Sequence, residues 1–497
     1  MDLDFKQLLL TLLPDLFVVV ALFVALGVDY SKLRSARLTK RYETAFRISA
    51  LGLLIGLVMI IMQAAGAMSV MDTSATHGQL NLTTGTLTLK AALFALGLAV
   101  LPLARHDLVT THASEYFALI LLATLGMGFV VTSQNLLGAF VALELVSLSL
   151  YAMTALNQSR AASGEAALKY LTFGAVSSGF LLFGLSYLYG ATGELNLINL
   201  AQLESTSLLI VAYLLIFVGL GFKLALAPFH LWAPDVYQSA PTPVAGWIGS
   251  GSKIAAAALL LVLLQPVVNS PELKKALVLA LTALAVASML VGNLGALRQT
   301  NLKRLLAYSA IANAGYLLVG VLAFDAPITD KANANQSVFF YILVYSIASL
   351  GAFAVISVLA DRLGRDAEIR DFNGCWKSMP RLSVAFMIFL LSMAGIPPLS
   401  GFLGKFYLFL AAISAQPDAA SLGQGLYWLV AFALVMSVVS LYYYLRVLKA
   451  FLVVSDEDCE AKPVTVDAAA GLAIFALAFI TLSLGLWPEP LLNLLAE

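Results

Sequence analysis

The chain has 497 residues, of which 61% are hydrophobic and 11% are charged, and its mean hydropathy is +0.93. Soluble proteins carry about 25% charged residues, so this composition excludes a soluble protein and places the chain in a lipid bilayer. The formal net charge of zero argues against a nucleic-acid partner. Cys375 and Cys459 lie in polar loops without a CxxC or Cys/His spacing, so neither a metal site nor a disulfide framework is indicated.

Apolar runs of the length of a membrane-spanning helix, about 20 residues, recur fourteen times along the chain. They predict an all-α membrane protein that forms a single polytopic domain over residues 1–497. The expected spans are 8–28, 44–65, 87–104, 114–132, 136–157, 166–190, 207–235, 244–265, 274–296, 302–323, 336–360, 381–411, 426–454 and 465–488. The first run lacks a small-residue cleavage site, so no signal peptide is expected. The tyrosines at 442–444 are expected in an interfacial aromatic belt.

Lysines and arginines are concentrated in the links on one side of the expected spans. Nineteen lie in the links after spans 1, 3, 5, 9, 11 and 13, and five lie on the other side. The nineteen are Lys32, Arg34, Arg37, Lys40, Arg41, Arg47, Arg105, Arg160, Arg298, Lys303, Arg304, Arg362, Arg365, Arg370, Lys377, Arg381, Arg446, Lys449 and Lys462. The five are Lys6, Lys90, Lys274, Lys275 and Lys331. Since basic loops remain in the cytoplasm, both termini are expected on the outer side.

Two of the spans, the seventh and the twelfth, are interrupted by prolines close to charged residues. In the seventh span, Lys223 precedes Pro228 and His230, and in the twelfth, Lys405 follows Pro398. An interrupted backbone at membrane depth must be buried in protein or line a wet cavity, because hydrocarbon offers its polar groups no partners. Broken helices with charges at the break are how many transporters build their ion sites.

The spacing around the first break recurs at the second. A Pro-x6-Asp-x-Tyr pattern starts at Pro228, and a Pro-x6-Lys-x-Tyr pattern starts at Pro398. Five spans separate the two patterns, so the units that contain them would have opposite orientations in the membrane. This predicts an inverted repeat, in which spans 4–8 (114–265) correspond to spans 9–13 (274–454).

One glutamate and four lysines lie within the expected spans rather than in loops. They are Glu144, Lys169, Lys223, Lys253 and Lys405. A charge inside the bilayer is costly, so each of these residues should have a partner or water and marks a candidate functional site. Moving one charge changes whether its neighbour holds a proton. A row of such groups at one depth can therefore pass protons along or across the membrane.

Some of these residues also have a structural interpretation. Glu144 is alternatively a structural ion-pair partner, and Lys169 and Lys405 are alternatively anchors that extend to the lipid headgroups. His230 is suited either to hydrogen-bonding a freed carbonyl at the break or to relaying a proton. Asp235, near the cytoplasmic end of its span, is better explained as a cap or loop contact than as a relay.

Four parts of the sequence resemble the antiporter-like membrane subunits of respiratory complex I. They are Glu144, KLALAPFHLWAPDVYQSAPT (223–242), GALRQTNLKRLLAYSAIANAGY (295–316) and GIPPLSGFLGKF (395–406). Within that family, PDVYQSAPT resembles subunit N, whereas subunits L and M tend to read PDAM or PDAH. A lysine at 405 instead of a glutamate also disfavours subunit M. Asn313 stands where relatives often have a histidine, which puts a titrating role there in doubt.

The resemblance implies fourteen transmembrane helices with two inverted five-helix repeats. It also implies that Glu144 and Lys223 form a modulating pair, and that Lys253, together with His230, connects the two halves of the chain. Lys405 would then gate the opposite half-channel. Lys169 matches the additional lysine of the family's sixth span.

The function implied by the resemblance is that of a proton-translocating membrane subunit of NADH–quinone oxidoreductase, which couples quinone reduction to proton pumping. The alternative is a subunit of a multi-subunit sodium/proton antiporter. In the first case the chain is part of an enzyme but has no redox centre and no metal of its own, since NADH, FMN, iron–sulfur clusters and quinone are handled by partner subunits. The implied partners are subunit M, the small subunits K and J and the lateral helix of subunit L, in a bacterial inner membrane.

Overall fold

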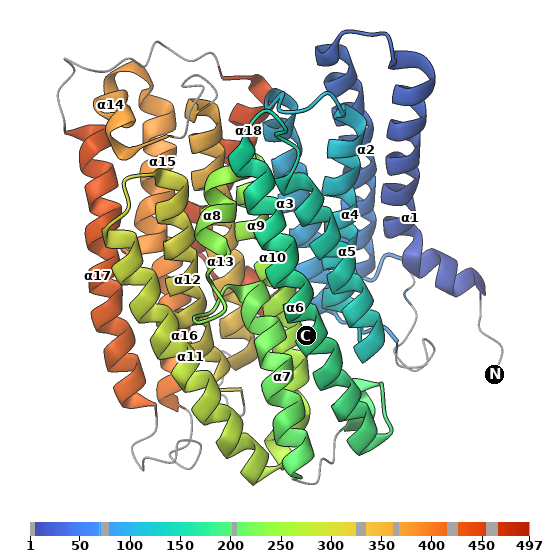
Figure 1. Ribbon diagram of the computed structural model, residues 1–497, viewed down its shortest axis with the longest axis vertical. Coiled ribbons are helices and arrows are strands. Elements are labelled where there is room, and N and C mark those ends of the chain that lie inside the picture. The colour runs from blue at the N-terminus through green and yellow to red at the C-terminus, as the bar shows by residue number, and fades with distance from the viewer. Residues whose placement is uncertain are drawn as a thin grey trace.

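The computed structural model describes residues 5–68, 70, 79–200, 206–324, 334–360, 367–414, 426–453 and 466–496. Nearly all of these residues lie in helices that run roughly along one direction, as Figure 1 shows. The helix is the natural element here, because it satisfies every backbone hydrogen bond within one segment and so tolerates hydrocarbon on its surface.

The helices follow one another with short connections. In chain order they are α1 (Phe5–Val28), η1 (Asp29–Leu33), α2 (Leu38–Ala64), α3 (Thr84–His106), α4 (Ala113–Thr132), α5 (Leu136–Thr154), α6 (Ala161–Thr192), η2 (Leu197–Leu200), α7 (Ser207–Leu224), α8 (Ala233–Ser239), α9 (Thr242–Gly249), α10 (Gly251–Leu264), η3 (Gln265–Asn269), α11 (Pro271–Leu297), α12 (Leu302–Val321), α13 (Ala334–Ala360), η4 (Ile369–Phe372), α14 (Cys375–Ser378), α15 (Pro380–Ala394), α16 (Ser400–Ser414), α17 (Tyr427–Leu452), α18 (Ala468–Leu486) and α19 (Glu489–Leu494).

Thirteen candidate membrane spans occur in the described part of the chain, each long and apolar enough to cross a bilayer. They match thirteen of the fourteen runs expected from the sequence. The remaining run, 381–411, forms two shorter apolar helices, α15 and α16, with the break between them. The eighth span consists of α9 and α10, which meet at Ser250. The prediction of an all-helical membrane protein with breaks in spans 7 and 12 is confirmed.

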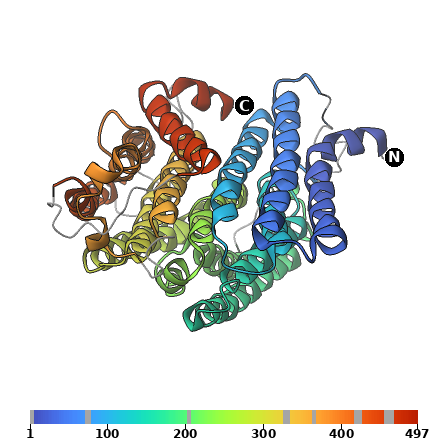
Figure 2. The same ribbon diagram turned by 90° about the horizontal axis from the view of Figure 1, so that it is seen from above.

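The chain progresses laterally across the bundle. Viewed from above, the N-terminal helices lie on one side and α15 to α17 on the other, with the green helices α6 to α10 between them (Figure 2). Helix α13 has a central position and packs against α9, α10, α12, α15, α16 and α18. Helix α18 lies beside α13 and α3, so the last span closes back onto the first part of the chain.

Two lysines that the sequence suggested would lie in loops are buried inside helices. Lys90 lies in α3 with 3% of its surface exposed, and its Nζ is 2.6 Å from the Asp15 carboxylate on α1. Lys303 lies in α12 with 5% exposed and donates a hydrogen bond to the Ala240 carbonyl at 2.8 Å. Both are hidden by tertiary partners that hydropathy does not reveal.

The basic residues counted in the expected loops include four that lie outside the described ranges: Lys331, Arg362, Arg365 and Lys462. Cys459 lies outside them as well.

Polar contacts fix α1 against α2. Pro14 lies inside α1 and lacks the N–H that would bond the Leu10 carbonyl one turn earlier. The side-chain amide of Gln63, on α2, donates to that carbonyl at 3.3 Å and to the Thr11 carbonyl at 3.1 Å. The glutamine therefore supplies hydrogen bonds beside a proline in a region where lipid cannot supply them.

Candidate functional site: a row of buried lysines across two helix breaks

The first break begins at the C-terminal end of α7. Ala225 has a positive φ of 58°, and the Leu226 N–H donates to the Gly221 carbonyl at 2.7 Å. This left-handed cap ends the helix and leaves the last carbonyls of α7 without helical partners. Trp232 donates its indole N–H to one of them, the Phe222 carbonyl, at 3.2 Å. The freed carbonyls concentrate partial negative charge at the break.

Glu144 and Lys223 meet beside this break. The Lys223 Nζ is 3.9 Å from Glu144 Oε1, and it donates a hydrogen bond to the Ser147 hydroxyl on α5. The hydroxyl of Ser178, on α6, donates to the same glutamate oxygen at 2.6 Å. The Lys223 side chain is 10% exposed and that of Glu144 is 28% exposed. A carboxylate with this hydroxyl donor and a lysine within 4 Å forms a pair in which each charge stabilises the other.

Lys253 lies deeper in the bundle, on α10, with 2% of its surface exposed. Its Nζ donates to the Ala310 carbonyl on α12 at 2.8 Å and to the Leu224 carbonyl at 3.3 Å. Leu224 is the last residue of α7, next to Lys223 in the chain. No ion pair joins Lys253 to an acid within the described residues. Its charged form therefore depends on the carbonyl dipoles at the break.

The second break repeats this arrangement with a different lysine. Gly395, with φ of 84°, follows the last residue of α15. Lys405, on α16, donates to the Met393 and Ala394 carbonyls at 3.1 and 3.3 Å and to the Ser437 hydroxyl at 3.2 Å. Only 5% of Lys405 is exposed, so the side chain turns back to the break instead of extending to the headgroups. The interpretation of Lys405 as a surface anchor is therefore wrong.

Polar side chains between α11, α12 and α13 lie between Lys253 and Lys405. Asn313, one turn after Ala310 on α12, accepts a hydrogen bond from the Tyr341 hydroxyl at 2.8 Å. Asn293, on α11, donates to the Tyr316 hydroxyl at 3.2 Å. The Lys405 Nζ lies 4.8 Å from the centre of the Tyr316 ring. Hydroxyls and amides thus occupy the interior between the two lysines.

Two of the three consecutive tyrosines belong to this interior and not to an interfacial belt. Tyr443 and Tyr444 are 0% exposed, whereas Tyr442 is 63% exposed. Tyr443 donates to the Asn293 side chain at 3.3 Å, and Tyr444 hydrogen-bonds the Ser309 hydroxyl. The prediction of an aromatic belt is wrong for these two residues, because α17 turns one face toward α11 and α12.

Lys169 and Asp235 lie apart from the buried row in a half-exposed ionic cluster. Lys169 Nζ is 2.7 Å from Glu165 and 3.0 Å from Asp235. Asp235 also accepts from Arg304 on α12 at 2.7 Å, so the cluster joins α6, α8 and α12. Asp235 lies in the first turn of α8 but caps no N–H. It acts as an ion-pair contact between helices.

His230 lies within the first break and is half-buried. Its Nδ1 is buried without a hydrogen-bond partner among the described residues. Its backbone carbonyl accepts from the Ala233 N–H at 2.9 Å. The ring does interact with the Pro228 backbone inside the break, so the hydrogen-bonding interpretation keeps support beside the proton-relay interpretation.

The structure therefore brings Glu144 and Lys223 together, links Lys253 to them through the first break, and places Lys405 at the second break. The sequence drew attention to Asn313 but not to Asn293, Tyr316 or Tyr341, although Asn293 within an apolar span was a usable signal. No group of three or more His, Cys, Asp or Glu side chains able to hold a metal ion occurs in the described ranges.

The chain is similar to known membrane proteins along its whole length. The family model of the NADH:quinone oxidoreductase/Mrp antiporter transmembrane region matches residues 133–449. Subunit N 2 of NADH-quinone oxidoreductase from Acidobacterium capsulatum is 42% identical over 99% of both chains. Subunit N from Desulforamulus reducens is 41% identical over 76% of both chains.

A chain of respiratory complex I from Thermus thermophilus is 32% identical, with a TM-score of 0.76 over 97% of this chain and 98% of that one. A chain of the Mrp complex from Dietzia sp. superimposes with a TM-score of 0.79 over 97% and 95%, at 22% identity, which shows a shared fold. The chain belongs to the NADH:quinone oxidoreductase/Mrp antiporter family, within its subunit N branch.

Proposed function

We propose that this chain is a proton-translocating membrane subunit of an NADH–quinone oxidoreductase. The observation that carries the proposal is the row of buried lysines at the two helix breaks. A lysine held by backbone carbonyls in a dry interior keeps a proton that a small change in its surroundings can release. The subunit N relatives, similar over the whole chain, support the assignment to this enzyme.

The roles of the residues follow from their contacts. Glu144 and Lys223 form the modulating pair, since their separation of 3.9 Å lets either charge set the protonation of the other. Lys253 bridges the halves, because it touches the end of α7 and the interior of α12. Lys405 holds a proton in the second half. His230, within the first break, is proposed to connect the halves together with Lys253, and Lys169, in its half-exposed cluster, is proposed to be the additional lysine of the sixth span.

The two halves of the chain are proposed to be inverted repeats, 114–265 and 274–454. Ala225 and Gly395 precede the matched prolines by the same three residues and both have positive φ. The N–H groups that follow them, of Leu226 and Ile396, donate to the carbonyls of Gly221 and Leu391. The same cap thus ends both broken helices. Counting α15 and α16 as one crossing gives fourteen spans.

The chain is proposed to lie in a bacterial inner membrane with both termini on the periplasmic side. Its neighbours would be subunit M, the small subunits K and J, and the lateral helix of subunit L. NADH, FMN, iron–sulfur clusters and quinone would be bound by partner subunits, while this chain supplies the proton path.

Isolating the assembly through a tag on this chain and reconstituting it in vesicles tests the proposal. We expect NADH and a quinone to drive proton movement across the vesicle membrane, and a protonophore to abolish it. A sodium gradient applied without NADH should move no protons. Proton movement driven by sodium alone, with no NADH-dependent quinone reduction in the preparation, would instead identify a sodium/proton antiporter.

A further inference from the structure

Helix α18 borders a groove that the proton path does not use. The groove lies between α2, α3, α13 and α18, has a volume of about 540 Å³, and is lined only by apolar side chains. Short side chains on facing helices, including Ala95 on α3 and Ala476 on α18, leave the space open. All four helices are candidate spans, so the groove lies at the depth of the hydrocarbon core.

The groove ends at an ionic cluster that contains an arginine. Arg105, in the last turn of α3, lies with its guanidinium carbon 5.3 Å from the centre of the Phe46 ring, which lines the groove. Arg105 also pairs with Glu43 and lies 3.6 Å from Asp467, the residue before α18. The ring of His106 is 3.2 Å from the same aspartate. The Arg105 guanidinium therefore stands where the apolar lining stops, within a cluster that also holds the Glu43 and Asp467 carboxylates.

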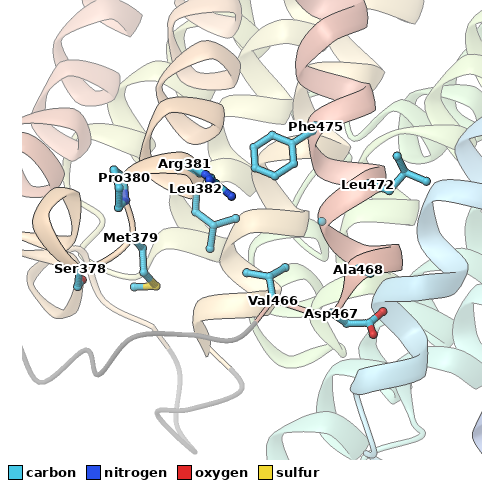
Figure 3. A pocket seen from close by; sticks show the side chains of 11 residues that line it. Ser378, Met379, Pro380, Arg381, Leu382, Val466, Asp467, Ala468, Leu472 and Phe475 are labelled. Atoms are coloured by element: carbon cyan, nitrogen blue, oxygen red, sulfur yellow. The ribbon is translucent and has the colours of Figure 1, made fainter.

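A second cavity of about 570 Å³ adjoins this end on the other side of α18, between α18 and the start of α15 (Figure 3). Arg381 points into it from α15, and Asp467 lies at its edge. Leu472, on α18, lines both cavities. Arg381 makes no ion pair with a described residue. Its charge is available to a ligand.

We propose that one anionic phospholipid of the bilayer binds here, with an acyl chain in the groove and its phosphate between Arg105 and Arg381. Apolar walls at membrane depth accept hydrocarbon, and basic pockets between membrane helices at the cytoplasmic side suit anionic headgroups. A helix of a neighbouring subunit is too large to fit inside this groove. Its cylinder, about 10 Å wide across a core about 30 Å thick, needs more than about 2,000 Å³. The lipid holds the last span against α2 and α3.

Photo-crosslinking in vesicles that contain the assembled complex tests this site. Two probes carry the same diazirine on an acyl chain, one a phosphatidylglycerol and the other a phosphatidylcholine. We expect the phosphatidylglycerol to label peptides of α3 and α18 more strongly. Ala95→Trp and, independently, Ala476→Trp should abolish this labelling by filling the groove. Ala431→Trp, at an exposed position on α17 that lines neither cavity, should leave it unchanged.

Charge is tested separately. Each basic residue near the membrane surface favours an anionic lipid by about fivefold, so Arg105→Gln should lower the preference for phosphatidylglycerol by about that factor. Arg370→Gln, which removes an exposed arginine paired with Glu368 outside the groove, should not change it. Equal labelling by both probes in the wild type, labelling unaffected by both tryptophan variants, or crosslinks from the groove to another subunit would overturn the proposal.

Discussion

At the scale of single residues, the buried lysines share a partner that sequence alone rarely reveals. Lys253 and Lys405 each donate to carbonyls at the end of a broken helix. A helix C-terminus carries partial negative charge and stabilises a cation near it, but less strongly than a carboxylate would. The lysines are thus held where a change in nearby charge can decide whether they keep their protons.

Replacing Lys405 distinguishes proton transfer from packing. Lys405→Leu removes the titratable group, whereas Lys405→Glu supplies another that, when protonated, can still donate to the Ala394 carbonyl. Since positioned proton transfer typically contributes about a hundredfold or more, we expect Leu to lower NADH-driven proton pumping severely and Glu to retain part of it. Pumping is measured in vesicles at matched levels of assembled complex. Near-wild-type pumping in both variants would show that Lys405 is not on the path.

A second residue-scale prediction concerns the Asp15–Lys90 ion pair, whose side chains are each 4% exposed. Lys90→Met leaves the Asp15 carboxylate buried without its partner and should destabilise the chain by about 3–5 kcal/mol. Adding Asp15→Leu removes the orphaned charge and should restore most of the lost stability. Thermal denaturation of the purified complex measures both effects. If the double variant is no more stable than the single one, the pair has a role beyond charge compensation.

At the scale of helices, the two breaks are built alike although little of their sequence is shared. The helix before each break ends at a residue in the left-handed conformation, Ala225 after α7 and Gly395 after α15. The last carbonyls of each helix accept hydrogen bonds from a lysine on another helix. The lysines come from different places, α10 in one half and α16 in the other. If the two halves are the inverted repeats proposed above, the lysine at the break is the part in which they differ.

The contact between Lys405 and the second break depends on the absence of a side chain at Gly395. At φ of 84°, an added Cβ is strained and would lie 3.2 Å from Cδ of Lys405 and 3.5 Å from its Nζ. We expect Gly395→Ala to displace the lysine from its carbonyls and to lower pumping severalfold. Gly190→Ala, on α6, meets no atom within 4 Å and serves as the control. Equal pumping in the two variants would mean that the break tolerates this shift.

The sequence was sufficient to predict the helices, because hydropathy reports directly on membrane depth. It also identified Lys223 and Lys405 through the prolines beside them. It did not reveal that Lys90 is buried, because its partner Asp15 lies 75 positions earlier in the chain. Tyr444 was wrongly assigned to the interfacial belt for a similar reason. A tyrosine suits both a membrane interface and a buried polar site, and only its contact with Ser309 in the folded chain distinguishes the two.

At the scale of the whole molecule, the uneven distribution of basic residues predicts one orientation in the membrane. Ser35 and Cys375 should then face the cytoplasm, and Thr84 should face the periplasm. Single-cysteine variants at 35, 84 and 375, labelled in intact cells with a thiol reagent that does not cross membranes, measure this. We expect labelling at 84 alone. Labelling at 35 but not at 84 would invert the topology.

We propose that the charges inside this chain form a proton path whose operation is coupled to quinone reduction elsewhere in the assembly. Lys223→Ala tests it most directly, since Lys223 pairs with Glu144 at the first break. In vesicles with normally assembled complex, we expect both NADH-driven quinone reduction and proton pumping to fall, while Lys275→Ala, at the exposed start of α11, retains both. Full quinone reduction together with full pumping in Lys223→Ala would contradict the claim.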